Sequence, residues 1–172
     1  MRFKTILISV IVLFSANTFA TNYDVERSKY TKALKYFKNN DYKNFKKLKS
    51  QLINYPLYAD LEYKSLHKSK IKKEQKIIKF IEKYKTSYVS RKAYINLIYR
   101  LSSKNKYNTL IQNYKNIGST DLHCLYIRAK IKSNLTKDID KEIVPIWLSS
   151  KSQPKSCDFM FKWFYKKGKL SD

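Results

Sequence analysis

The side chains of this sequence that could catalyse a reaction are its carboxylates. A pair of them could carry out acid/base cleavage of the glycosidase type. Such a pair flanks the scissile bond, and one member lies in a pocket that raises its pKa. The chain has 13 acidic residues. The glutamates lie among lysines, where we expect solvated charge pairs four residues apart on polar helix faces; they are Glu26, Glu62, Glu74, Glu82 and Glu142. We therefore assign no catalytic residue.

The two histidines, His67 and His123, do not have the spacing of a metal site. Several ligands must converge on a metal, and here only His123 and Cys124 are adjacent, without a His-x-x-x-His or Cys-x-x-Cys pattern. Two glycines in the whole chain cannot supply a phosphate loop or a dinucleotide fingerprint. We expect the histidines to be surface or packing residues, and we predict no metal and no cofactor.

Aromatic side chains make up 15% of the residues and could stack on sugars or bases. Tyrosine has an apolar ring and a polar tip, so it suits both a ligand platform and packing between helices. At helical spacing, packing is the more frequent role. The tyrosines concerned are Tyr84, Tyr94, Tyr99, Tyr107, Tyr114 and Tyr126.

The two cysteines, Cys124 and Cys157, are the smallest number that can form a disulfide in an oxidising compartment. Closing a loop of about 33 residues would stabilise the fold by roughly 3–4 kcal/mol in the chain-entropy model. The alternative is two buried thiols.

The net charge of +24 comes from 37 basic and 13 acidic residues, and only five of the basic residues are arginines. Readout of bases and clamping of phosphates favour the planar fork of arginine over lysine. The lysines are scattered, and they accompany the abundant Asn, Ile and Tyr that A/T-rich codons produce. Codon bias on a solvated surface, a polyanion such as cell wall or anionic lipid, and nucleic acid are the three explanations. We favour the first and predict no nucleic-acid partner.

Residues 1–20 have the pattern of a secretory signal peptide. Arg2 and Lys4 precede an apolar stretch over 6–14, and Thr18 and Ala20 place small residues before a cut after Ala20. An uncleaved anchor is the alternative, although the apolar stretch is short for a membrane span. Removal of the signal leaves 35 basic against 13 acidic residues, a net charge of +22. We predict export and no integral membrane span.

Apolar residues recur at helical spacing throughout the remaining chain. Asn39-Asn40-Asp41 breaks the first helix and can cap the next, Gly118-Ser119 makes a second break, and Gly168 follows the last helix. The stretches are 30–37, 45–52, 57–61, 77–81, 94–101, 106–114, 122–129, 139–147 and 159–166.

Eight or nine short helices with short connections predict an all-α fold, an irregular superhelix or solenoid with tetratricopeptide-like hairpins. No strict 34-residue repeat is visible. The last helix of such an array has an unpacked face, which we expect around Phe161, Trp163 and Phe164. Marginal stability or self-association would follow.

Three segments together resemble the helical superhelix (U-shaped) domain of the soluble lytic murein transglycosylases. The specific one is Ser152-Gln153-Pro154-Lys155-Ser156-Cys157-Asp158, and it is followed by Phe161, Trp163, Gly168 and Leu170. The other residues that carry the resemblance are Tyr55-Pro56-Leu57-Tyr58, Leu61-Glu62-Tyr63, Leu122-His123-Cys124, Ala129-Lys130 and Ile146-Trp147-Leu148.

The resemblance implies a periplasmic protein related to enzymes that cleave the bond between N-acetylmuramic acid and N-acetylglucosamine in peptidoglycan. It also implies a disulfide between Cys124 and Cys157, where the family has paired cysteines. In the family a separate lysozyme-like domain cleaves the glycan with a Glu that precedes a Ser. This chain has no Glu-Ser dipeptide and stops at Asp172. We therefore expect residues 21–172 to be a truncated superhelical domain without a catalytic residue.

Three functions are compatible with these observations. The first is a non-catalytic, exported protein that associates with peptidoglycan. The second is one part of a split enzyme that works with a separately encoded lysozyme-like domain. The third is an unspecific basic protein that binds polyanions or membrane surfaces. We favour the first and expect no cleavage of murein by this chain alone.

Overall fold

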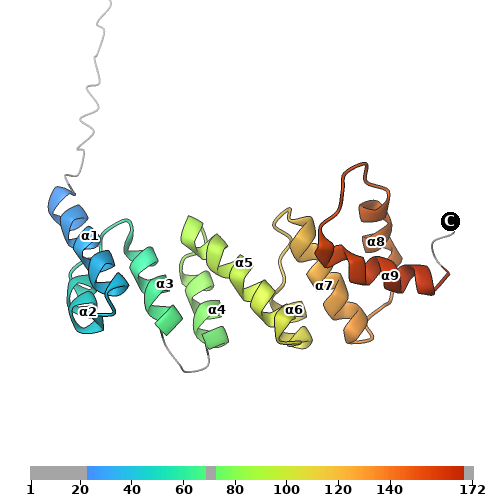
Figure 1. The fold of residues 1–172 in the computed structure, drawn as a ribbon, viewed down its shortest axis with the longest axis horizontal. Helices are drawn as coiled ribbons and strands as arrows, with labels where there is room; N and C mark the ends of the chain where they lie inside the picture. The colour runs from blue at the N-terminus through green and yellow to red at the C-terminus, as the bar shows by residue number, and fades with distance from the viewer. Residues whose placement is uncertain (1–22, 69–72, 169–172) are drawn as a thin grey trace, which may run out of the picture.

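The described part of the chain is a row of short helices (Figure 1). The structure is a computed structural model and describes residues 23–68 and 73–168. Within these residues it has nine α-helices, one 3₁₀-helix and no strand, so the all-α prediction is confirmed. The helices are α1 Asp24–Lys38, α2 Tyr42–Ser50, α3 Tyr58–Lys68, α4 Lys73–Lys83, α5 Tyr88–Ser103, α6 Tyr107–Asn113, α7 Thr120–Lys132, α8 Asp140–Trp147 and α9 Asp158–Lys166, with the 3₁₀-helix η1 at Lys155–Cys157. The predicted signal peptide, residues 1–20, lies outside the described residues.

Three of the turns between helices are built in the same way around an asparagine. Asn40, Asn105 and Asn134 each have a positive φ, between 54° and 61°, and each is the second residue after its helix, α1, α5 and α7 respectively. In each turn the next residue donates its N–H to a carbonyl five positions back, as Asp41 does to Tyr36 at 2.9 Å. This is the Schellman ending, in which asparagine replaces the usual glycine. Three helical hairpins are therefore closed in a chain that has two glycines.

Side-chain caps begin three of the helices. Asp41, Ser87 and Ser119 accept free backbone N–H groups in the first turns of α2, α5 and α7. At the other end of the chain, Gly168 follows α9 with φ 64° and donates its N–H to the Tyr165 carbonyl at 2.9 Å. The residues predicted from the sequence to interrupt the helices therefore lie at helix ends in the structure.

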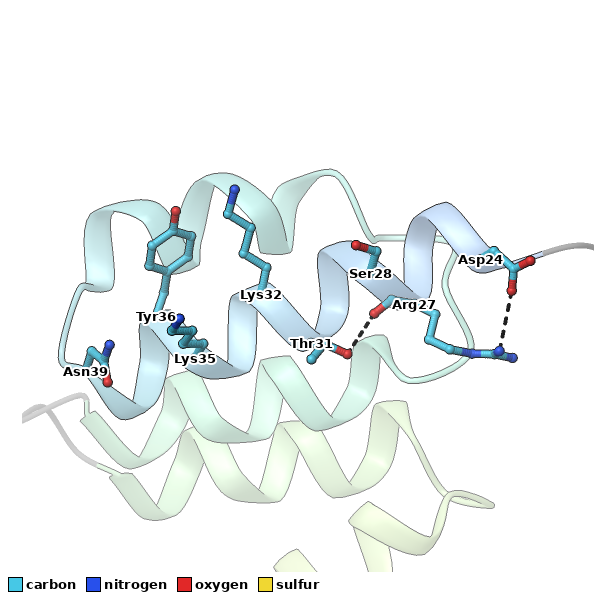
Figure 2. A pocket seen from close by; sticks show the side chains of 8 residues that line it. All are labelled: Asp24, Arg27, Ser28, Thr31, Lys32, Lys35, Tyr36 and Asn39. Carbon is cyan, nitrogen blue, oxygen red and sulfur yellow. Dashed lines mark hydrogen bonds and ion pairs between the residues drawn. The ribbon is translucent and has the colours of Figure 1, made fainter.

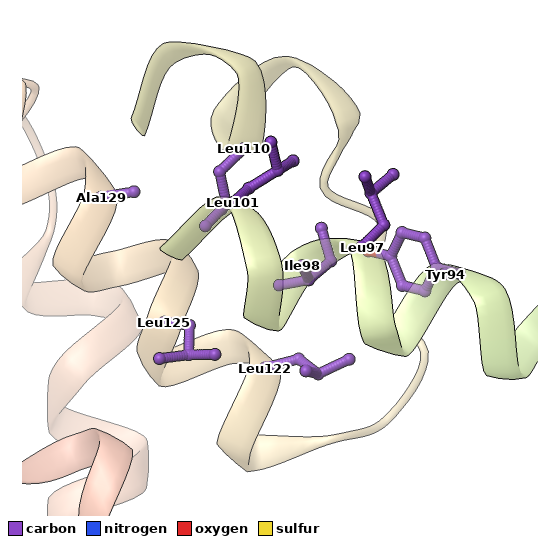
Figure 3. Close-up of a cluster of buried hydrophobic side chains, with 8 residues drawn as sticks. All are labelled: Tyr94, Leu97, Ile98, Leu101, Leu110, Leu122, Leu125 and Ala129. Carbon is purple, nitrogen blue, oxygen red and sulfur yellow. The ribbon is translucent and has the colours of Figure 1, made fainter. Parts of the chain in front are cut away.

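The hydrophobic core is a succession of four small clusters along the row rather than one centre. The clusters lie in turn between α1 and α3, between α3 and α5, between α5 and α7, and between α7 and α9. Figure 3 shows the third, where side chains of α5, α6 and α7 gather around Ile98 and Leu110. Neighbouring helices therefore depend on each other for burial, as in other helical arrays.

The end of the row differs from the sequence expectation. Phe164 is buried against the cluster of Cys124 and Cys157, and Phe161 and Trp163 are only partly exposed. The prediction that the three aromatic residues form an open apolar face is wrong, because α9 packs them toward α7 and α8. The exposed apolar side chains of this end include instead Trp147 of α8, Leu148 directly after it, and Tyr165 of α9.

Candidate functional site

Glu62 and Glu74 lie between helices and not on solvated faces. Glu62 accepts a hydrogen bond from the Tyr84 hydroxyl at 2.7 Å and pairs with the Lys83 Nζ at 3.1 Å. Glu74 pairs with the Arg100 Nε at 3.3 Å and the Lys106 Nζ at 2.9 Å. The expectation of pairs four residues apart is wrong for these two glutamates, because their partners are at least 21 positions away.

These contacts hold the two carboxyl groups as ions. Burial opposes the ionisation of Glu62, but the hydrogen bonds from Tyr84 and Lys83 outweigh it and lower the pKa. The hydrogen bond from Lys106 is the main cause of the lowered pKa of Glu74. A general acid needs a raised pKa. Both glutamates are therefore suited to joining helices and unsuited to donating a proton.

His123 belongs to an aromatic cluster around α7. Its Nδ1 lies 3.0 Å from the Tyr114 hydroxyl, and the rings of Tyr114 and Tyr126 stack with 4.2 Å between their centres. Glu142 of α8 lies 4.0 Å from the His123 Nε2 and also pairs with Lys130. Burial lowers the pKa of His123 despite the carboxylate. The side chain of the other histidine, His67, lies outside the described part of the structure.

The lowered pKa of His123 predicts a loss of stability on acidification. The ordinary pKa of histidine, which applies to the unfolded chain, is near 6.5, and the pKa in the folded chain is lower. At a pH between these two values, the unfolded chain binds more protons than the folded chain. The free energy of unfolding therefore falls as the pH drops through this window. The binding of one proton changes the free energy of unfolding by at most about 1.4 kcal/mol per pH unit. Thermal unfolding of the wild type and of His123→Gln at pH 7.5 and pH 5 measures the effect. We expect a smaller pH-dependent shift in the variant, and equal shifts would contradict the assignment to His123.

The six tyrosines considered as ligand platforms are all engaged within the protein. Tyr94 is buried, and Tyr84, Tyr114 and Tyr126 have the contacts described above. The remaining two donate hydrogen bonds to side chains, Tyr107 to Asn105 at 2.6 Å and Tyr99 to Asp121. A tyrosine outside this set, Tyr88, is 80% exposed and was not predicted as a site residue.

One depression on the described chain, of about 690 Å³, lies along α1 (Figure 2). Its lining side chains come from α1 and from Asn39 directly after it. Arg27 pairs with Asp24 at 3.4 Å, and the Lys32 Nζ lies 6.0 Å from the centre of the Tyr36 ring. Several of its polar groups are therefore already in contact with one another, and a single helix face cannot surround a ligand.

A second pocket, of about 430 Å³, lies between the beginning of α5 and the loop that joins α6 to α7. We call it the α5 pocket. Three basic side chains line it, Lys85, Arg91 and Lys115, and no acidic residue is among its described lining. Tyr88 lies at the same pocket. This combination of cations and an exposed ring can bind an anionic ligand that has an apolar face.

The loop that carries Lys115 is fixed to α5 by a buried phenol. The Tyr94 hydroxyl donates to the Lys115 carbonyl at 2.8 Å and accepts the Lys115 N–H at 2.6 Å. Tyr94 is 6% exposed, and burial raises its pKa. The two sides of the α5 pocket are thus held together without a ligand.

The disulfide joins α7 to the last hairpin. Cys124 and Cys157 are bonded, with 4.9 Å between their Cα atoms, and both are fully buried. This is the bond that the family resemblance implied. No group of three or more His, Cys, Asp or Glu that could hold a metal occurs among the described residues. In the same part of the chain, no helix has both the length and the apolar character to cross a bilayer.

The fold defined by these helices is similar to the superhelical domain of a soluble lytic transglycosylase. No family model matches the chain. It is 24% identical to the soluble lytic murein transglycosylase of Escherichia coli K12 over 152 residues, and 23% identical to that of Salmonella typhimurium. Each match covers 87% of this chain and 24% of the relative, so the chain spans about a quarter of the length of these relatives.

Solved structures agree with this assignment. The 70-kDa soluble lytic transglycosylase of E. coli superposes with a TM-score of 0.76 at 23% identity, over 87% of this chain and 25% of that one. An inactive mutant of lytic transglycosylase Slt from Pseudomonas aeruginosa gives 0.70 at 20% identity, over 83% and 24%. The resemblance noted in the sequence is confirmed, and the matched part of the relatives is their N-terminal helical region.

Proposed function

We propose that the chain is exported to the periplasm, loses its signal peptide after Ala20, and associates with peptidoglycan through the helical array of residues 21–172. The observation that carries the proposal is the likeness in fold and sequence to enzymes named for their action on murein. We further propose that the chain does not cleave murein by itself. The ion-paired glutamates between the helices support this, because their lowered pKa values do not suit an acid.

Cosedimentation with purified sacculi tests the proposal. Protein recovered from the periplasm of an expressing strain is mixed with sacculi at physiological salt, next to an unrelated protein of matched positive charge. We expect a larger bound fraction than for the control, since unspecific attraction is the same for both. Equal binding of the two proteins would contradict the proposal and would indicate a basic protein that binds polyanions without specificity. Release of anhydro-muropeptides by the purified chain would overturn the non-catalytic part.

A second candidate is a partner for a separately encoded catalytic domain. It is favoured by the apolar side chains left exposed at the end of the row, among which Leu148 is 75% and Trp147 48% exposed. Adding the purified chain to a separately expressed lysozyme-like domain should then raise the release of anhydro-muropeptides above that of the domain alone. The same rate with and without the chain would exclude this role.

A further inference from the structure

The α5 pocket collects positive charge that nothing in the described chain neutralises. Lys85, Arg91 and Lys115 form no ion pair with a described residue, whereas cations around Glu62 and Glu74 are paired. The three are exposed and come from two separate segments that meet at this pocket. An anion placed among them would relieve their mutual repulsion.

The other side chains that line the α5 pocket indicate that the anionic ligand also has an apolar face. Tyr88 offers an exposed ring, and Ile81 and Ile117 add partly exposed apolar surface. A sugar ring has apolar C–H faces that suit an aromatic side chain, and arginine binds a carboxylate with two parallel hydrogen bonds. A volume of about 430 Å³ lies in the range of pockets that bind small molecules.

We infer that the α5 pocket binds a carboxylate-bearing sugar unit, with the ring against Tyr88 and the carboxylate among Lys85, Arg91 and Lys115. The inference rests on the proposed function, because peptidoglycan supplies such units through the carboxylates of its stem peptides and through the lactyl carboxylate of muramic acid residues that carry no peptide. The hydrogen bonds of Tyr94 to Lys115 hold the pocket in shape before binding, which reduces the ordering that binding requires. Tyr94 is accordingly a positioning residue.

Titration with a soluble disaccharide-tripeptide muropeptide tests the inference. The pocket variant is Lys85→Gln/Arg91→Gln/Lys115→Gln, and its matched control is Lys137→Gln/Lys151→Gln/Lys162→Gln, which removes the same charge from exposed positions outside the pocket. We expect the pocket variant to bind at least about tenfold more weakly and the control to stay within about twofold of the wild type. Both should elute equally early from heparin, since that attraction depends on net charge.

Several outcomes would overturn the inference. Equal losses in the two variants would show unspecific electrostatics, and unchanged binding in the pocket variant would place the ligand elsewhere. Wild-type protein that binds sacculi but no muropeptide would overturn the pocket and leave the proposed function standing. Binding of neither would remove both.

Chemical variants of the probe identify the carboxylate. A muropeptide amidated at all its carboxylates should bind at least about tenfold more weakly than the acid, and equal binding would contradict recognition of a carboxylate. Binding of the peptide-free disaccharide would assign the lactyl group, and binding of the peptide-bearing form alone would assign the stem peptide.

Tyr94→Phe should weaken binding while a circular dichroism spectrum confirms that the variant is folded. Undiminished affinity in this variant would contradict the positioning role.

Discussion

Breaking the Cys124–Cys157 disulfide is expected to lower the free energy of unfolding by about 3–4 kcal/mol. The bond closes a loop with a sequence separation of 33 residues, which contains the rest of α7, all of α8 and η1. Without it, the unfolded chain regains conformational freedom that the link removes. A loss of this size is a large share of the roughly 5–15 kcal/mol that stabilises an ordinary domain.

Urea unfolding of Cys124→Ala/Cys157→Ala measures this effect. Alanine is the better replacement, because serine would place hydroxyl groups in a site that is fully buried. Wild-type protein unfolded in the presence of reductant separates the loss of the link from the loss of sulfur packing. An unfolding midpoint that is the same in oxidised and reduced wild type would show that the bond contributes nothing to stability.

Replacing Ile98 by alanine is expected to cost about 2–5 kcal/mol. Ile98 is fully buried in the cluster that joins α5, α6 and α7, so the smaller side chain leaves a cavity in the middle of the row (Figure 3). Ile53→Ala is the matched control, because Ile53 is 62% exposed and its replacement should stay within about 0.5 kcal/mol. Urea unfolding of both variants gives the comparison. Similar losses in the two would contradict the burial of Ile98.

The helices could be predicted from the sequence because each has one apolar face and a recognisable end. The face of Leu122, Leu125 and Ala129 indicated α7. Its second buried face, with Ile127 and Ile131, could not be recognised, because a helix packed on two sides loses the one-sided pattern. This second face is the one on which the last hairpin packs and against which Phe164 is buried.

The candidate site could not be predicted, because its residues become neighbours only in the folded chain. Lys85 and Lys115 are two among many scattered lysines, and the hydrogen bonds between Tyr94 and the Lys115 backbone bring their segments together. The expectation for Glu62 and Glu74 is wrong for the same reason. Charge pairs along a helix can be seen in sequence, whereas the pairing of Glu74 with Arg100 depends on how α4 packs on α5.

The row of four small clusters has a consequence for how the chain folds. Helices contact chiefly their neighbours in chain order, so most native contacts join segments that are close in sequence. Such a topology has a low contact order, which favours fast folding, and it lets one end open while the rest stays folded. The two ends are unequal, because the disulfide restrains the hairpin of α8 and α9 whereas α1 packs chiefly on α2. Amide protons of α1 and α2 should therefore exchange with solvent first, and those of α7 last.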